Sequence, residues 1–144
     1  MERASLVIVN WNAGAALHAC LAAVFSSDGI DRDQVILVDN ASTDGSQFGL
    51  TTTYPALEVI QNSRNIGFAR AVNQGLVASR GEFAVLLNPD VILEPSALSR
   101  LTEFMIGHPC RLSPISSSIA RDAASGSVTQ SGLRRYQAGS SGSM

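Results

Sequence analysis

Four short apolar runs, each followed within two residues by a polar side chain, constrain the fold of this chain more than any other feature. They occupy residues 6–9, 35–38, 57–60 and 83–87, and they are rich in valine, isoleucine and leucine. Nearly continuous apolar runs of four or five residues are typical of strands that are covered on both faces, as in a parallel sheet. The pattern therefore predicts a buried, mostly parallel sheet.

Helical periodicity separates these runs. Residues 13–25 are rich in alanine and leucine, and Phe68, Val72 and Leu76 form a stripe at a spacing of four. Leu98, Leu101 and Met105 form a third apolar face after Pro95. Strands that alternate with helices predict a Rossmann-like α/β fold, a parallel sheet flanked by helices with right-handed crossovers.

Composition changes near residue 110. Of the last 32 residues, 14 are Ser or Gly. We therefore expect one α/β domain over residues 1–110 and a weakly ordered, Ser/Gly-rich C-terminal segment over residues 111–144.

Several reaction classes are excluded by what the composition lacks. The net charge is −2, which does not favour a nucleic-acid surface, and all ten basic residues are arginine. Without lysine there is neither a Walker-type phosphate loop nor a Schiff base. The chain has no G-x-G-x-x-G string, and its two cysteines form no C-x-x-C pair. His18 and His108 are expected to be structural.

The uncharged stretch over residues 4–27 resembles a membrane segment only superficially. Asn10, Asn12, Gly14 and His18 interrupt it, and its first unbroken apolar run covers only residues 6–9. A membrane span needs about 20 apolar residues. We therefore expect a cytoplasmic protein, either in the cytosol or peripheral to the inner membrane face.

Polar residues stand at all four predicted strand ends, namely Asn10, Asp39, Asn62 and the pair Asn88 and Asp90. Ligands of open parallel sheets bind in the crevice outside the carboxyl ends of the strands. Strand ends are also polar wherever a chain turns, so each position alone carries little weight. Their agreement predicts a binding crevice.

Four strings carry a resemblance to a known family: SLVIVNWN (5–12), VDNASTDGS (38–46), NIGFARAVNQG (65–75) and LLNPDVILEP (86–95). Over residues 5–109 the chain resembles the family 2 glycosyltransferases of the A-type fold, especially the rhamnosyltransferase-like bacterial branch. The resemblance implies a truncated A-type glycosyltransferase fold that binds a nucleotide-diphosphate sugar.

The resemblance implies a role for two strand ends in binding the nucleotide base. Asn10 and Trp11 would border the base, and Trp11 offers a flat apolar face. Asp39 would accept a hydrogen bond from a ring N–H of the base. Ordinary packing remains the alternative for Trp11, and a helix cap remains the alternative for Asp39.

The third string implies contacts with the diphosphate. Asn65, Gly67, Arg70 and Asn73 match the family's N-x-G-F-x-x-x-x-N pattern. A helix that begins after Gly67 would direct backbone N–H groups at an anion, and Arg70 could add a bidentate cation. A merely solvated Arg70 is the alternative.

The fourth string takes the place of the family's D-x-D metal motif, of which only the last carboxylate, Asp90, is present. Asn88 would contact the nucleotide, and Asp90 would hold Mg²⁺ or Mn²⁺ together with phosphate oxygens and water. A simple turn after Pro89 is the alternative for Asp90.

In the family, a sugar passes with inversion to an acceptor hydroxyl, here of a glycan or a lipid-linked glycan, with the help of a general base. The resemblance places that base in the half of the fold that follows the metal motif, so the catalytic residue stays unknown. We expect a nucleotide-sugar-binding half that is an enzyme only if a missing half or a partner completes it.

A catalytically inactive nucleotide-binding or assembly module is the alternative, and exposed apolar surface would favour a homo-oligomer. A nucleotidyltransferase is disfavoured because its glycine-rich, basic phosphate loop is lacking.

Overall fold

The computed structural model describes residues 4–30 and 33–107. His108 and the predicted Ser/Gly-rich segment over residues 111–144 lie outside the described residues. Among the helices of the described part, none is long and apolar enough to cross a membrane. The elements in chain order are β1 (Ala4–Asn10), α1 (Ala15–Phe25), β2 (Gln34–Asp39), α2 (Leu50–Thr53), β3 (Leu57–Gln61), α3 (Phe68–Ala78), β4 (Phe83–Leu87) and α4 (Ala97–Gly107).

All four predicted strands form, and they pair in one parallel sheet of order β3-β2-β1-β4. The register sets Asn10 opposite Asp39, and Asp39 opposite Gln61. On the other side of β1, Ile8 lies opposite Leu87. The carboxyl ends of the strands therefore meet at one edge of the sheet, as the sequence predicted.

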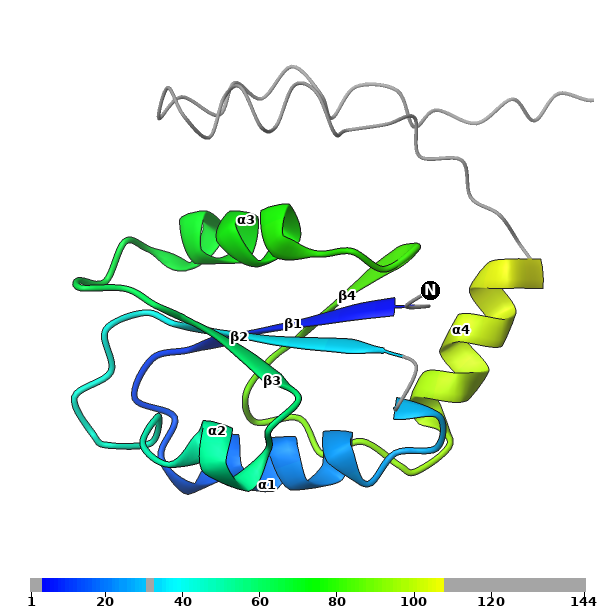
Figure 1. The fold of residues 1–144 in the computed structure, drawn as a ribbon, viewed down its shortest axis with the longest axis horizontal. Helices are drawn as coiled ribbons and strands as arrows, with labels where there is room; N and C mark the ends of the chain where they lie inside the picture. Colours follow the sequence, from blue (N-terminus) through cyan, green and yellow to red (C-terminus); the bar gives the residue numbers. More distant parts are fainter. Residues whose placement is uncertain (1–3, 31–32, 108–144) are drawn as a thin grey trace, which may run out of the picture. The chain divides into compact units, whose positions relative to one another are not determined.

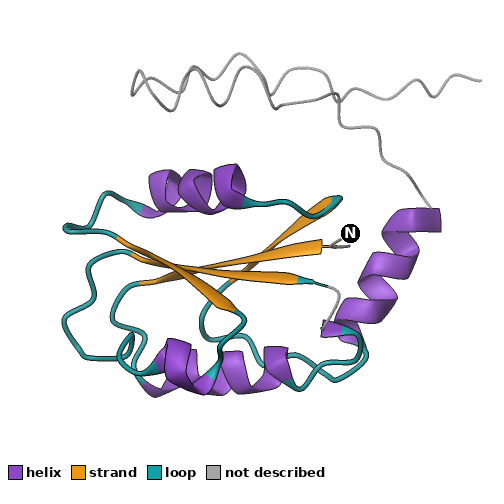
Figure 2. Cartoon of the chain, viewed as in Figure 1, coloured by secondary structure: helices purple, strands orange, loops and turns teal. Residues whose placement is uncertain are grey.

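The helices lie on both faces of the sheet (Figure 2). Right-handed crossovers explain their placement. The chain steps from β1 to β2 to β3 in one direction and places α1 and α2 on one face, then crosses back to β4 and places α3 on the other (Figure 1). The strand order reverses between β1 and β4, and this switch point is where open α/β sheets bind ligands.

The core has two parts, one on each face of the sheet. Leu6 and Ile8 of β1 pack with Leu17 and Leu21 of α1 in the larger cluster. Val7 and other alternate residues of β1 and β2 pack with α3 in the smaller one. Because both faces are covered, all seven residues of β1 are buried, which explains the unbroken apolar run in the sequence.

The predicted apolar stripe of α3 is only partly correct. Phe68 and Leu76 are 54% and 37% exposed, and only Val72 of the stripe packs against the core. The helix is buried instead through Ala71 and Gly75. A Cβ atom on Gly75 would lie 2.3 Å from Cγ1 of Val7, so α3 approaches the sheet too closely for large side chains.

Gly75→Ala should therefore destabilise the protein although alanine favours a helix. We expect a loss of about 1–3 kcal/mol from overpacking, reduced by up to about 1 kcal/mol of helix propensity. Urea unfolding followed by circular dichroism measures the change. Gly107→Ala is the matched control, because a Cβ there meets nothing within 4 Å. Equal stability of the two variants would contradict the close packing of α3.

The β3 edge of the sheet carries an ion pair. Nη2 of Arg80 lies 2.5 Å from Oε1 of Glu58, and both side chains are about half exposed. The hydrogen bond from Arg80 lowers the pKa of Glu58 below its usual value. A charged residue on an edge strand discourages further strand pairing, so this edge is protected.

Removal of the Glu58 carboxylate should lower the stability of the protein only at pH values at which this carboxylate is ionised. Because the folded-state pKa of Glu58 is lowered, its stabilising effect is present above about pH 5 and is lost as the pH falls through the lowered pKa. Solvent screens the pair, so Glu58→Gln should cost about 0.2–1 kcal/mol at neutral pH. Unfolding free energies at neutral and acidic pH measure this. A cost that persists in the Arg80→Gln background would contradict the pairing.

Candidate functional site

The carboxyl ends of β1 and β2 are joined by a buried side-chain pair. Nδ2 of Asn10 donates to Oδ1 of Asp39 at 2.7 Å, and both residues are 0% exposed. The same amide lies 3.0 Å from the hydroxyls of Ser42 and Ser46 in the loop after β2. Two residues that the sequence predicted for base recognition are thus in direct contact.

Asp39 accepts further hydrogen bonds on its second oxygen. Oδ2 accepts from the backbone N–H of Ser42 at 3.0 Å and from Nε2 of Gln61 at 2.5 Å. No helix begins directly after Asp39, since α2 starts only at Leu50, so the carboxylate fixes a turn and not a helix end. With one bond on Oδ1 and two on Oδ2, the carboxylate can accept one more hydrogen bond at Oδ1.

The end of β2 also holds the loop before α3. Nδ2 of Asn40 donates to Oδ1 of Asn65 at 2.8 Å, and Oδ1 of Asn40 accepts from the amide of Asn62 at 3.2 Å and the backbone N–H of Ile66 at 3.0 Å. Oδ1 of Asn65 accepts from the N–H of Gly67 at 2.8 Å. Asn65 and Gly67 are thereby anchored beside Asp39.

Gly67 has φ 86° and ψ 152° immediately before α3. Residues with a side chain rarely adopt this conformation, which gives a physical reason for the glycine in the string. Arg70 is exposed and Asn73 is half-buried in the helix that follows. Gln74 fixes this helix to the sheet through a reciprocal amide pair with Asn62 at 2.9 Å.

The loop after β2 is shaped by Asp44 and a strained residue. Oδ1 of Asp44 accepts from the hydroxyl and the N–H of Ser46, and Oδ2 accepts from the N–H of Gly14 at 2.8 Å. The bonds from Ser46, and then that from Gly14, hold the pKa of Asp44 below its usual value. Ala41 has φ 63°, a conformation that non-glycine residues rarely adopt and that is often found at functional sites.

The turn after β4 lies on the other side of β1. Asn88 and Asp90 are both exposed there. Sγ of Cys20 in α1 lies 3.7 Å from the carbonyl oxygen of Asn88, and burial, followed by the charge of Asp90, raises the pKa of the Cys20 thiol. The turn after β4 thus lies against α1.

Trp11 is 60% exposed directly after β1. Its indole therefore has free surface at the switch point, and packing in the core does not explain it. Asn12 follows with φ 54°, and its Oδ1 accepts from the N–H of Thr43 at 2.7 Å. The loops after β1 and β2, which lie together with the loop after β3 at the left of Figure 1, are therefore tied to each other.

Sequence reasoning assigned no role to two residues that hold this arrangement. Gln61 contacts the Asp39 carboxylate, and Asn40 connects the ends of β2 and β3. Gln61 directly precedes Asn62 and Asn40 directly follows Asp39, and the sequence did single out Asn62 and Asp39 as strand ends. Their signal was polarity at a strand end, which many turns share.

The described residues fit a divalent cation only if a single protein carboxylate holds it together with other ligands. In the described part of the chain no group of three or more His, Cys, Asp or Glu residues could hold a metal, so an all-protein cage is not formed there. Asp90 supplies one exposed carboxylate. Mg²⁺ and Mn²⁺ accept such a site when phosphate oxygens and water complete the coordination.

A doubly wound parallel sheet with polar loops at its switch point defines a Rossmann-like α/β protein. The model of the family described as Glycosyl transferase family 2 matches residues 5–115, which is more than half of the 144 residues. The chain belongs to this family.

Known relatives agree with this assignment. The chain is 31% identical over 81 residues to an N-acetylglucosaminyl-diphospho-decaprenol L-rhamnosyltransferase of Mycobacterium tuberculosis (strain CDC 1551 / Oshkosh), covering 48% of this chain and 26% of the relative. Its fold is similar to that of S. aureus TarS 1-349 in complex with UDP-GlcNAc, with a TM-score of 0.68, 22% identity, and coverage of 74% of this chain and 32% of that one. The mannosyltransferase PcManGT from Pyrobaculum calidifontis, in complex with GDP-Man and Mn²⁺, matches with a TM-score of 0.67, 24% identity, and coverage of 72% and 32%.

These structures confirm the predicted A-type glycosyltransferase fold. The chain spans about a third of the length of each of the two structures and about a quarter of the rhamnosyltransferase. These comparisons do not test the roles of the individual site residues, which stay predictions.

Asn10→Ala should destabilise the protein, because it removes the amide that donates to the buried Asp39 carboxylate. Loss of a hydrogen bond to a charged group costs about 1.5–3 kcal/mol. Chemical unfolding measures the cost, and Asn88→Ala, at an exposed asparagine after the neighbouring strand, serves as the control. Equal stabilities of the two variants would show that the buried pair does not hold the strand ends.

Proposed function

We propose that the carboxyl edge of the sheet binds a nucleotide-diphosphate sugar. The observation that carries the proposal is the hydrogen-bonded network at this edge, in which Asn10 holds Asp39 and Asn40 holds Asn65. Such a network keeps polar groups in fixed positions before a ligand arrives, which reduces the entropy cost of binding.

The base would bind between Trp11 and Asp39. The exposed indole of Trp11 offers a stacking surface. Asp39 has an acceptor position left on Oδ1, and a ring N–H of a pyrimidine or purine can fill it. Asp39 is 0% exposed and Gln61 donates to its other oxygen, so a base reaches the carboxylate only if a neighbouring side chain such as Gln61 moves aside.

The diphosphate would bind between α3 and the turn after β4. The first N–H groups of a helix have no partner within the helix and attract anions. Gly67 precedes that helix end without a side chain, and Arg70 lies exposed in its first turn. Asn73 and Asn88 would add neutral donors.

Asp90 would hold a Mg²⁺ or Mn²⁺ ion that binds together with the diphosphate. Such an ion neutralises the negative charge that develops on a departing nucleoside diphosphate. The structure of PcManGT, which is a complex with GDP-Man and Mn²⁺, supports this assignment.

We further propose that the bound sugar passes with inversion to an acceptor hydroxyl of a glycan or a lipid-linked glycan. The relative named N-acetylglucosaminyl-diphospho-decaprenol L-rhamnosyltransferase supports a lipid-linked acceptor. Such an acceptor is consistent with a cytoplasmic protein peripheral to the inner membrane face. The general base would come from a stretch of polypeptide that corresponds to the part of the longer relatives that this chain does not cover.

Titration calorimetry of the chain with UDP, GDP and dTDP, each with Mn²⁺ and with chelator, tests the binding step. We expect one nucleotide to bind, and to bind more tightly with Mn²⁺. Transfer of a radiolabelled sugar to lipid or glycan acceptors then tests catalysis. Binding without transfer would favour the inactive nucleotide-binding or assembly module, and no binding of any nucleotide would refute both.

Asp90→Asn should weaken nucleotide binding in Mn²⁺ and leave binding in chelator nearly unchanged, because its carboxylate acts through the metal. We expect a loss of about 1.5–3 kcal/mol, the range for interactions of a charged group. Glu94→Gln is the matched control, since it removes an exposed carboxylate four residues further along the same segment. An equal loss with and without metal would remove the role assigned to Asp90.

A further inference from the structure

Three polar side chains form a row across the carboxyl ends of β1, β2 and β3. Asn10, Asp39 and Gln61 are partners in the register of these strands. Partners on neighbouring parallel strands point to the same face of a sheet. The amides of Asn10 and Gln61 both donate to the carboxylate of Asp39, which therefore lies between two amide side chains.

The donors to Asp39 differ in how freely they can leave it. Asn10 is 0% exposed, and its Oδ1 also accepts from the backbone N–H of Ala13. Ser42 donates through its backbone and is buried as well. Gln61 is exposed. If its side chain turns away, water can satisfy its amide, so Gln61 is the donor that can be displaced at the lowest cost.

The Gln61 amide is held chiefly by Asp39. Its Nε2 lies 2.5 Å from Oδ2 of Asp39, but 3.4 Å from the carbonyl oxygen of Asn62. The second contact is too long for a strong hydrogen bond. Hydrogen bonds to a charged group are stronger than neutral ones. The arrangement in which Gln61 covers Asp39 is therefore favoured over one in which its side chain extends into water.

We propose that Gln61 is a gate over Asp39, which the amide covers in the free protein and which the base of the nucleotide uncovers by displacing that amide. This inference rests on the proposed function, because it concerns the same base site. When Gln61 turns away, Oδ2 opens beside the position left on Oδ1. A ring N–H of the base then replaces the donor that the carboxylate has lost. A ligand without a base brings no such donor and leaves the gate closed.

Such a gate weakens nucleotide binding by the free energy needed to open it. The apparent dissociation constant is the intrinsic constant divided by the fraction of molecules that are open. The loss of a hydrogen bond to a charged group corresponds to a factor of about ten or more. A residue that only positions Asp39 would act in the opposite direction, because its removal would leave the carboxylate less well placed for the base. The direction of the change in affinity therefore separates the two roles.

Titration calorimetry of the full chain, with Mn²⁺ and the nucleoside diphosphate that the wild type binds best, tests the gate. Gln61→Ala should lower the dissociation constant about tenfold or more. Gln61→Met should lower it as well, because methionine keeps the length of the side chain but cannot donate a hydrogen bond. Inorganic pyrophosphate with the same metal should bind equally to the wild type and to both variants, because it has no base.

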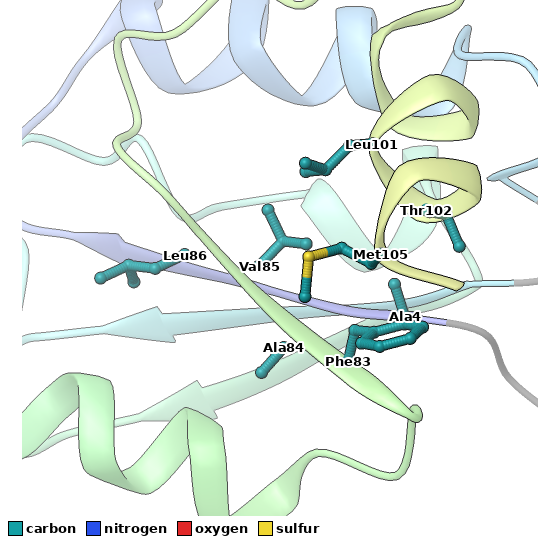
Figure 3. A pocket seen from close by; sticks show the side chains of 8 residues that line it. All are labelled: Ala4, Phe83, Ala84, Val85, Leu86, Leu101, Thr102 and Met105. Carbon is teal, nitrogen blue, oxygen red and sulfur yellow. The ribbon is translucent and has the colours of Figure 1, made fainter. Parts of the chain in front are cut away.

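Leu101→Ala is the control for a general loss of stability. Leu101 lines an apolar groove between β4 and α4 (Figure 3), and β4 and β3 lie at opposite edges of the sheet that the described residues form. Leu101 belongs to the predicted apolar face of α4 but is 42% exposed, while Leu98 of the same face is buried. Leu101→Ala should therefore leave nucleotide binding unchanged.

Circular dichroism of each variant establishes that it is folded. If the wild type binds a nucleotide, unchanged or weaker binding by Gln61→Ala or Gln61→Met would overturn the gate and leave the proposed function intact. Tighter binding of pyrophosphate by these variants would also overturn it, because the effect would not arise at the base. If neither the wild type nor the variants bind any nucleotide, the gate and the proposed function are both refuted.

Discussion

The carboxylate of Asp39 is buried at the end of β2, and a buried charge persists only where donors surround it. The amide of Asn10, the backbone of Ser42 and the amide of Gln61 supply those donors from β1, from the following loop and from β3. Satisfying this one carboxylate therefore ties three parts of the chain together at the carboxyl edge of the sheet. The positions of the surrounding loops follow from this requirement.

Asn40 extends the same principle by one residue. Its side chain satisfies Asn65, Asn62 and the backbone of Ile66, so the loop before α3 is fixed to the end of β2. The helix itself approaches the sheet closely because Gly75 has no side chain. The start of α3 and the buried carboxylate are thus held by one continuous set of contacts, although they are far apart in the sequence.

The two edges of the sheet differ in a way that local sequence does not reveal. An uncharged run such as FAVLL predicts a buried strand, and this pattern is the same for a strand at the centre of a sheet and for a strand at its edge. Only the strand order shows that β4 lies at the edge of the sheet formed by the described residues while β1, with a similar run, is central. Leu101 and Leu86 are exposed for the same reason, since the side that they face has no neighbour among the described residues.

The sequence by itself determined the strands and their parallel pairing, because apolar runs record local burial, and four strings of residues carried the resemblance to the family. It also indicated Asn10 and Asp39, whose side chains are hydrogen-bonded to each other, and Asn65, which Asn40 holds. Only the tertiary structure decided which face of α3 is buried, that Gln61 and Asn40 join the network, and which strands lie at the edges of the sheet that the described residues form. These properties depend on the distances between elements that are remote in the sequence, and no local pattern of residues specifies those distances.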